Sequence, residues 1–407
     1  MLKKLWIYYL PLLFIPNFWG FTGETAFGNL ELMDILIFPF FLLLSLAPAN
    51  RSKKMGNSVY RYFQLFLFWA ALSLLLTPFL FPGVTNYKLQ FSFLKLAKFT
   101  LYLIVGYLII HRIDRNNHYL YLKSLSITAI LIGGSIAYQN FTSDFNRYGI
   151  IKITLYSAQN VISVAGAIFV GFMAPIVFLK QSNLKKPKLH LTIGVLVCTV
   201  GILLSSGRTG LVALLCGLSY IGYKKFWNKQ VWVASILGIV FVVFSYFNFE
   251  SFQRDVDRTI FPNEEQIQKL QKYNAGVGGL DDGKRLAGFF HELPLLFNNP
   301  VTGTGFFHRG GATGLMIMGS HNFWLQMALE TGIIGLVLWF LILRKIWHQG
   351  NRFFKTYENV ALSLHSLIIV VFISGMGGEF FYAGEGLMAF LLVYALAGST
   401  IIQRKIH

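Results

Sequence analysis

The chain has 407 residues, of which 55% are hydrophobic and only 13% are charged, and its mean hydropathy is +0.57. A soluble globular domain carries about 25% charged residues and a disordered chain carries few hydrophobic ones, so this composition excludes both classes. The net charge of +18 would indicate nucleic-acid binding in a soluble protein. In a membrane protein it indicates the Lys and Arg that cytoplasmic loops collect, so no nucleic-acid partner is expected.

The apolar runs of the chain predict an all-α polytopic membrane protein with about twelve transmembrane helices, because about 20 apolar residues cross a bilayer as a helix. The first run follows Lys3 and Lys4 without a clear small-residue cleavage site, so we expect an uncleaved first helix. In chain order the predicted spans are 5–22, 30–48, 62–81, 93–110, 124–139, 159–179, 189–205, 209–222, 231–247, 322–343, 360–376 and 386–401.

The distribution of basic residues predicts the orientation of these spans. Most of the 35 Lys and Arg residues fall in alternate connections, beginning with the N-terminus. The positive-inside rule then puts both termini in the cytoplasm and makes the protein a multi-pass protein of the plasma (inner) membrane. Cys198 and Cys216 each lie inside an apolar run, which leaves no disulfide framework and no thiolate metal cluster.

One connection differs from the others in length and polarity. Residues 248–320 hold nearly half of the 17 acidic residues and form a long outer (periplasmic) loop between the ninth and tenth predicted helices. Its part 284–297 has the spacing of a short amphipathic helix. We therefore expect one integral membrane domain, with helices one to nine in 1–247, the periplasmic loop in 248–320 and the last three helices in 321–407. A loop of this length is usually functional.

The strongest local pattern is a His-Asn pair followed by two spaced glycines, where the long loop meets the tenth helix. If a helix starts at His321, Gly332 and Gly335 return to within about 40° of the His direction. Glycines on that stripe would let a helix or a lipid chain approach closely. Glu330 would point to the opposite side and would not pair with His321. The alternative is that His321 or Asn322 only caps the helix.

Two arginines are candidates for binding an anion, because a guanidinium stays charged and fits phosphate oxygens with a fork of donors. Arg208 lies in the tight outer turn Ser-Ser-Gly-Arg-Thr-Gly, residues 205–210, and Arg285 lies in the long loop ahead of an Asn-Pro-Val-Thr-Gly-Thr-Gly segment, residues 299–305. The alternatives are that Arg208 extends to lipid headgroups and that Arg285 is a solvated loop charge. Arg254 and Arg258 are reserve candidates. The pair of glycines at 303 and 305 is too short to predict a phosphate loop.

Other polar residues in and beside the helices give weaker signals. Lys95 and Lys98 share one face at the outer end of the fourth helix, where they extend to the interface or add positive potential to an anion site. The few acidic residues near helix ends, Asp34, Glu330 and Glu385 among them, form no midplane chain. The sequence shows no nucleotide-binding motif and no His/Cys cluster at metal spacing, so neither a metal nor a cofactor is expected.

The His-Asn…Gly-x-x-Gly pattern at 321–335, its place after a long outer loop, the Arg turn and the segment from Arg285 to Gly305 together resemble the O-antigen ligase superfamily. The resemblance implies a membrane glycosyltransferase that takes a glycan from undecaprenyl diphosphate and passes it to an acceptor hydroxyl outside the plasma membrane, without metal. It implies that Arg208 and Arg285 bind the diphosphate and that His321 is the catalytic base.

Within this resemblance the most favoured activity is ligation of O-antigen to lipid A–core, and a polysaccharide polymerase that uses the same donor is the alternative. A different class, a solute transporter, has the same helix number and orientation. Transporters often carry internal repeats and interrupted helices near the midplane, which the sequence does not indicate, and the candidate polar residues lie toward the outer surface.

Overall fold

The computed structural model describes fourteen continuous stretches, the single residue 381 and five isolated helical positions. These are residues 4–14, 23–25, 28–30, 32–48, 56–80, 86–113, 117–142, 159–179, 189–205, 208–225, 293–306, 322–355, 357–378, 381 and 384–398, and positions 233, 236, 240, 243 and 247.

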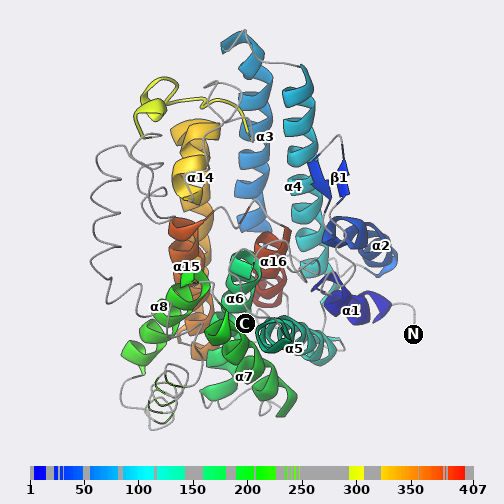
Figure 1. Cartoon of the computed structure of the whole chain (residues 1–407), viewed down its shortest axis with the longest axis vertical. Coiled ribbons are helices and arrows are strands. Elements are labelled where there is room, and N and C mark those ends of the chain that lie inside the picture. The colour runs from blue at the N-terminus through cyan, green and yellow to red at the C-terminus, as the bar shows by residue number, and fades with distance from the viewer. Residues whose placement is uncertain are drawn as a thin grey trace.

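Helices account for nearly all of the described residues (Figure 1). Their bounds are α1 Leu5–Tyr9, the 3-10 helix η2 Leu10–Phe14, α2 Leu32–Leu46, α3 Gly56–Leu80, α4 Asn86–Arg112, α5 His118–Thr142, α6 Gln159–Phe178, α7 Leu189–Leu204, α8 Arg208–Lys224, the 3-10 helix η3 Leu293–Phe297, α14 Phe323–Phe353, α15 Glu358–Gly377 and α16 Gly384–Gly398.

The first predicted span, 5–22, is described as far as Phe14. The α-helix ends at Tyr9 and continues as the 3-10 helix η2, in which Pro11 has no N–H to donate to an α-helical bond. A short antiparallel hairpin follows, in which β1 (Gly23–Thr25) pairs with β2 (Gly28–Leu30). Apart from Leu30, the hairpin falls between the predicted spans 5–22 and 30–48, and the all-α fold class is confirmed for the described residues.

Five helices are long and apolar enough to cross a membrane, and five shorter apolar helices accompany them in the described part of the chain. This confirms a polytopic helical membrane protein. The number of twelve stays a prediction, because the ninth span, 231–247, is described only at isolated positions and both termini lie outside the described residues. The division at residues 247 and 320 also stays a prediction, since most of the outer loop lies outside the described residues.

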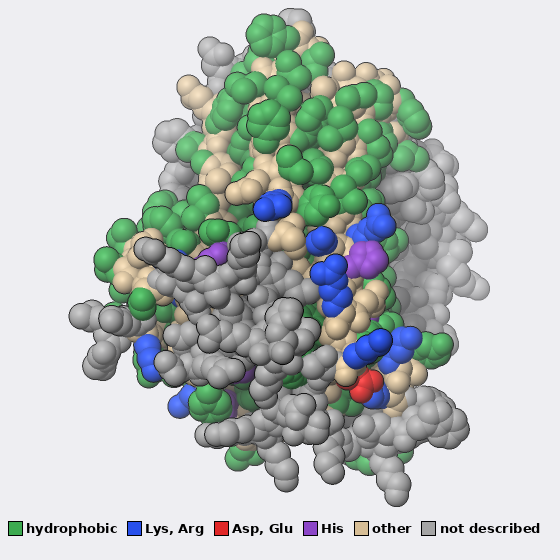
Figure 2. Space-filling model, turned by 180° about the vertical axis from the view of Figure 1, so that it is seen from behind, with side chains coloured by type: hydrophobic (Ala, Val, Ile, Leu, Met, Phe, Trp, Pro, Cys, Tyr) green, Lys and Arg blue, Asp and Glu red, His purple; other side chains and the backbone are tan. Residues whose placement is uncertain are grey.

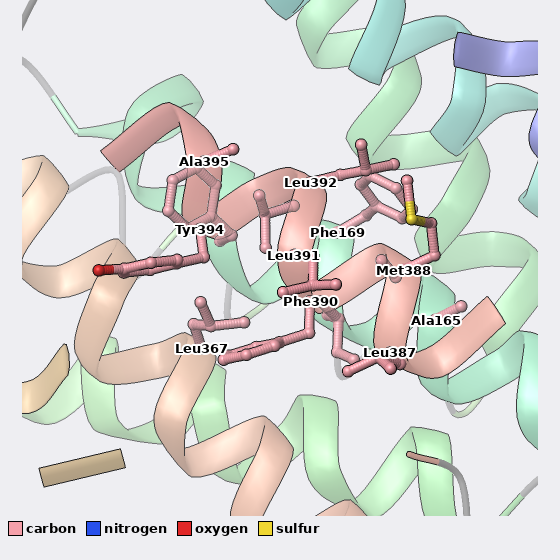
Figure 3. Packing of buried hydrophobic residues seen from close by; sticks show 14 of the residues in the cluster. Ala165, Phe169, Leu367, Leu387, Met388, Phe390, Leu391, Leu392, Tyr394 and Ala395 are labelled. Atoms are coloured by element: carbon pink, nitrogen blue, oxygen red, sulfur yellow. The ribbon is translucent and has the colours of Figure 1, made fainter. Parts of the chain in front are cut away.

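Small residues set the distances between the helices. A Cβ atom on Gly201 of α7 would lie 2.5 Å from the Cα atom of Gly133 on α5, so the two helices touch through their backbones. Close contact of this kind matters because lipid tails are as apolar as Leu, and helix association in a bilayer depends on packing more than on burial from water. In the centre, α16 packs against α6 and α15; Figure 3 shows Leu387 and Leu391 of α16 among Phe169 of α6 and Leu367 of α15.

The surface has the polarity expected of a protein in a bilayer. On α3, Phe68 is 69% exposed and Phe79 is 82% exposed. Figure 2 shows an apolar surface over the upper part of the molecule, with Lys and Arg side chains gathered below it. Contiguous exposed apolar surface of this extent is rare on soluble monomers, so we assign this region to the hydrocarbon layer.

Candidate functional site

The segment after His321 does not form one straight membrane helix, as the predicted span 322–343 required. Gly332 has φ 67° and ψ −176°, which interrupts α14. The rings of Trp324 and Phe340 stack with their centroids 5.3 Å apart, and those of Phe323 and Trp339 also lie 5.3 Å apart. Sixteen residues of straight helix would separate each pair by about 24 Å. The part 323–331 therefore folds back against the part 333–353.

The expectation of a His321, Gly332 and Gly335 stripe along one continuous helix is accordingly wrong. Gly332 does not offer a flat helix face to a partner, because it is the point at which the helix ends and the chain reverses. A positive φ is the conformation that glycine adopts without the steric cost of a Cβ atom. Gly332 was visible in the sequence, but glycine occurs both at helix interfaces and at helix breaks, so its presence alone did not predict the break.

The break frees backbone groups that a continuous helix would satisfy, and the turn 299–306 pairs with them. The amides of Thr304 and Gly305 donate to the carbonyl oxygens of Leu329 (2.8 Å) and Glu330 (2.9 Å). In return, the amide of Ile333 donates to the carbonyl oxygen of Pro300 at 2.8 Å. Because the amides at 304 and 305 are used in this way, the Gly-Thr-Gly turn holds α14 in place and does not present those amides to a phosphate.

A polar stripe on α3 completes this junction. Trp69 donates from Nε1 to the carbonyl oxygen of Thr331 at 2.7 Å, and the Oγ atom of Ser73 lies 2.5 Å from the carbonyl oxygen of Thr302. Thr77 lies one turn further on and donates from Oγ1 to the carbonyl oxygen of Thr304 at 3.1 Å. The sequence analysis missed this stripe, although polar residues four apart on an apolar helix are the signal of one polar face.

The fold-back helix also contains a buried carboxyl group. Glu330 is 1% exposed, and its Oε1 atom accepts a hydrogen bond of 2.7 Å from Nε2 of Gln326, which is four residues earlier on the same helix. Ionisable residues buried in membrane helices are costly and are usually paired. The structure therefore gives Glu330 a partner on its own helix, at the spacing that brings two helical side chains together.

The starts of α8 and α14 meet on the last turns of α15. A Cβ atom on Gly375 would lie 2.6 Å from Cε2 of Trp324, and one on Gly377 would lie 2.5 Å from Cγ2 of Thr209. The Oγ1 atom of Thr209 also donates to the carbonyl oxygen of Gly377 at 3.4 Å. Gly375 and Gly377 are separated by only about 3 Å along the axis. The turn that contains Arg208 and the helix that follows His321 therefore reach the same level of α15, although they are more than 100 residues apart, and they contact nearly opposite faces of it because residues two apart on a helix point about 160° apart.

The start of α16 joins the same region through aromatic contacts. Phe381, in the connection between α15 and α16, lies 5.3 Å from the ring of Phe323. A Cβ atom on Gly384 would lie 2.5 Å from the hydroxyl oxygen of Tyr102, which hydrogen-bonds to Asp34 near the start of α2. Four helices, α2, α8, α14 and α16, therefore begin around this connection. Helix N-termini carry partial positive charge and favour bound anions.

The three predicted site residues differ in how much of them the structure describes. Arg208 is the first residue of α8, and its side chain lies outside the described part; His321 and Arg285 lie outside it altogether, as do the reserve candidates Arg254 and Arg258. Asn322, the residue after His321, is the N-cap of α14: its Oδ1 atom accepts from the amides of Trp324 (3.0 Å) and Leu325 (3.1 Å). Asn322 therefore performs the capping that the sequence left open between the two residues.

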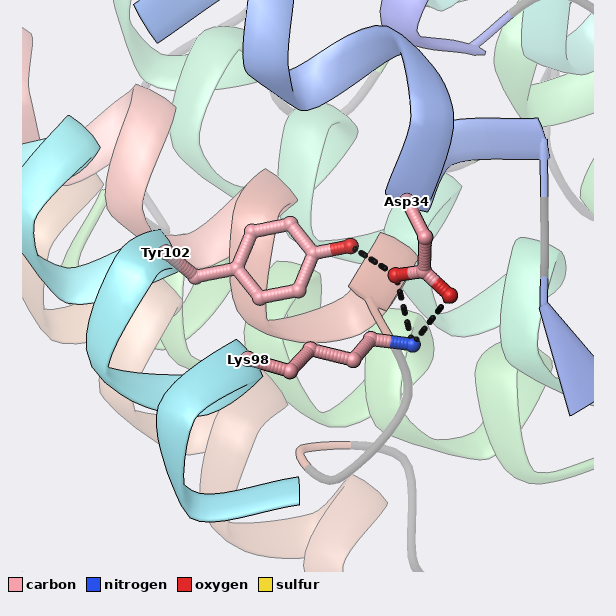
Figure 4. Close-up of polar contacts among 3 residues, drawn as sticks. All are labelled: Asp34, Lys98 and Tyr102. Carbon is pink, nitrogen blue, oxygen red and sulfur yellow. Dashed lines mark hydrogen bonds and ion pairs between the residues drawn. The ribbon is translucent and has the colours of Figure 1, made fainter. Parts of the chain in front are cut away.

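The two lysines of α4 do not form the paired cationic face that the sequence allowed. Lys98 is ion-paired with Asp34 of α2, its Nζ atom lying 2.7 Å from Oδ1 and 2.8 Å from Oδ2 (Figure 4). Tyr102 donates its hydroxyl to Oδ1 at 2.8 Å. The Nζ atom of Lys95 lies 5.3 Å from the centre of the Phe91 ring. Since Asp34 neutralises Lys98, this lysine joins α4 to α2 and adds little to the potential of an anion site.

Within the described residues, no group of three or more His, Cys, Asp or Glu side chains is arranged to hold a metal ion. The expectation of a metal-independent and cofactor-independent site stays a prediction.

Comparison with known families identifies the segment that contains these elements. Residues 193–340 match the model of a family described as O-Antigen ligase. The match includes Arg208, Arg285 and His321, and it ends at Phe340, the partner of Trp324 in the fold-back pair. The resemblance inferred from the motifs is thereby confirmed. No curated protein matches the chain.

Proposed function

We propose that this protein transfers a glycan from undecaprenyl diphosphate to an acceptor hydroxyl at the outer face of the plasma membrane, because residues 193–340 match the model of a family described as O-Antigen ligase. The acceptor that we propose is lipid A–core, which makes the reaction O-antigen ligation. The protein is a membrane enzyme whose donor and acceptor both carry lipid, so the bilayer itself is a partner in presenting them.

The reaction needs two kinds of group, and the proposed residues supply both. The acceptor oxygen attacks the anomeric carbon while the bond from that carbon to the diphosphate oxygen breaks and its electron pair stays with the diphosphate. Arg208 and Arg285 stabilise the charge that develops on the leaving group, which lowers the barrier because that charge is greater in the transition state. His321 accepts the proton of the acceptor hydroxyl. Attack from the face opposite the diphosphate inverts the anomeric centre.

The observation that carries this proposal is the meeting of α8 and α14 on α15. Thr209, which follows Arg208, contacts Gly377, and Trp324, three residues after His321, contacts Gly375, so the segments that carry Arg208 and His321 reach the same level of α15. The N-termini of these helices add partial positive charge of the sign that a diphosphate requires. The apolar surroundings, Phe323 and Phe381 among them, lower the local dielectric and strengthen the attraction between a guanidinium and a phosphate.

The first experiment replaces the proposed base in purified protein supplied with lipid-linked glycan and lipid A–core. His321→Ala is expected to abolish glycan transfer while the unfolding transition stays unchanged, because the helix cap is Asn322. His348→Ala, at the other end of α14, is the control and is expected to keep full activity. Near-normal transfer by His321→Ala would refute the role of His321 as base.

The second experiment separates the two acceptors. With lipid-linked glycan and lipid A–core, a ligase makes lipopolysaccharide; with lipid-linked glycan alone, a polymerase makes longer chains. Formation of lipopolysaccharide supports the assignment as a ligase. Formation of longer lipid-linked chains in the absence of lipid A–core would show that the protein is a polymerase instead. Loss of both products in Arg208→Ala, with donor retained less well on the purified protein, supports the assignment of the diphosphate site.

A further inference from the structure

A groove between α14 and α15 stands apart from the proposed transfer site. Its volume is about 460 Å³. The part of α14 after the fold-back contributes Phe340, Leu343, Arg344 and Trp347, and α15 contributes Ile369 and three further apolar side chains. Arg344 is the one charged residue among the described residues of the lining. The groove is therefore apolar except for this single guanidinium.

Three aromatic rings stack at one end of the groove, where Phe340 and Phe372 belong to its lining. Trp324, on the fold-back helix, stacks on Phe340 at 5.3 Å and on Phe372 at 5.6 Å, and its Nε1 atom donates to the carbonyl oxygen of Phe372 at 3.0 Å.

The other end of the groove has the features of a headgroup site. Trp347 is held in one orientation by stacking on His365, with centroids 4.0 Å apart and planes 13° apart. The side chain of Arg344 is exposed, and no hydrogen bond or ion pair joins it to the part of the chain that the structure describes. Lys345 and Arg352 follow on α14, so this end of the groove is the one nearer to the cytoplasm by the positive-inside rule. Tryptophan and arginine together are characteristic of the membrane interface.

We propose that this groove binds one hydrocarbon chain of an anionic membrane phospholipid, with the lipid phosphate on the guanidinium of Arg344. The apolar lining fits the chain, and the guanidinium presents paired donors to phosphate oxygens. Basic pockets between transmembrane helices on the cytoplasmic side are known to bind anionic headgroups. The bound lipid fills the space between α14 and α15, and so supports the helix against which Trp324 and the fold-back helix pack. This inference does not depend on the proposed glycan transfer.

The test compares lipids retained by purified full-length protein after detergent exchange, measured by native mass spectrometry and by the rise in the thermal unfolding temperature. Phosphatidylglycerol is expected to be retained and to stabilise the protein, and phosphatidylcholine is expected to do neither. Arg344→Gln is expected to weaken phosphatidylglycerol binding about fivefold, whereas Lys345→Gln, which removes the same charge from the neighbouring position, is expected to change it little.

A second pair of variants tests the groove rather than the charge. Ile369→Trp fills the groove and is expected to abolish retention, while Ile104→Trp, on an exposed position of α4, leaves it intact. Equal retention of phosphatidylglycerol by Arg344→Gln and the unaltered protein would overturn the headgroup assignment. A photoreactive polyprenyl phosphate that crosslinks at Ile369 in preference to phosphatidylglycerol would overturn the assignment of the occupant.

Discussion

Trp324 and Phe340 lie sixteen residues apart in the sequence and stack face to face, with ring centroids 5.3 Å apart and planes inclined by 30°. This contact exists because the chain reverses at Gly332, and the reversal brings the start of α14 back beside its own second half. It fixes the start of α14, Asn322 and Phe323, beside the second half of the same helix and against α15. The predictions below test the features that hold this arrangement.

Gly332→Ala is expected to destabilise the protein and to lower glycan transfer. The residue has φ 67°, and a Cβ atom there would collide with the carbonyl oxygen of Val301, so the cost is about 1–3 kcal/mol or more. The control is Gly134→Ala on α5, where a Cβ atom would meet nothing within 4 Å and alanine is favoured by about 0.5–1 kcal/mol. Detergent-titration unfolding of both variants measures the difference, and equal stabilities would contradict the reversal at Gly332.

Ser73→Ala is expected to cost about 1–3 kcal/mol, because it leaves buried carbonyl oxygens of Thr302 and Glu330 without that donor. Ser45→Ala removes an exposed hydroxyl bonded only within α2 and is expected to stay within about 0.5 kcal/mol of the unaltered protein. The same unfolding titration applies to both. A Ser73→Ala variant as stable as Ser45→Ala would show that α3 does not hold the junction.

Gly377→Ala is expected to reduce glycan transfer by pushing the start of α8 away from α15, since its Cβ atom would lie 2.5 Å from Cγ2 and 2.7 Å from Oγ1 of Thr209. Thr209→Ala removes both of those atoms. The double variant Gly377→Ala, Thr209→Ala is therefore expected to recover much of the activity that Gly377→Ala loses. Failure of the double variant to exceed Gly377→Ala would argue against this contact as the one that positions Arg208.

The ion pair of Asp34 and Lys98 is expected to show strong coupling in a double-mutant cycle with Asp34→Asn and Lys98→Met. Side-chain exposures of 9% and 19% leave either group poorly solvated when its partner is removed, so a coupling energy of about 0.5–3 kcal/mol is expected. The pair of Lys225 and Glu358, with exposures of 24% and 43%, is the control and is expected to show less than about 1 kcal/mol. A smaller coupling for Asp34 and Lys98 than for the control would contradict their role in joining α2 to α4.

The helical class, the membrane setting and most helix positions followed from the sequence because hydrocarbon requires every backbone group in a span to be bonded within its own segment. Apolar runs such as 62–81 and 360–376 therefore map directly onto α3 and α15. The motif around His321 and Gly332 was also visible. Its shape was predicted wrongly, because the composition of 322–343 satisfies a straight helix as well as a folded one. Only the turn 299–306 and the stripe on α3 supply bonds for the backbone groups of a broken helix.

The order of residues alone thus determined that this chain is a membrane protein and which ends of its helices carry positive charge, and it supplied the prediction that Arg208, Arg285 and His321 form the site. The three-dimensional structure decided that α14 reverses, that Lys98 is neutralised by Asp34, and that the residues following Arg208 and His321 both rest on α15. The physical reason is that local composition fixes what each segment can be, whereas contacts between segments far apart in the chain determine which of the permitted shapes has all its polar groups satisfied.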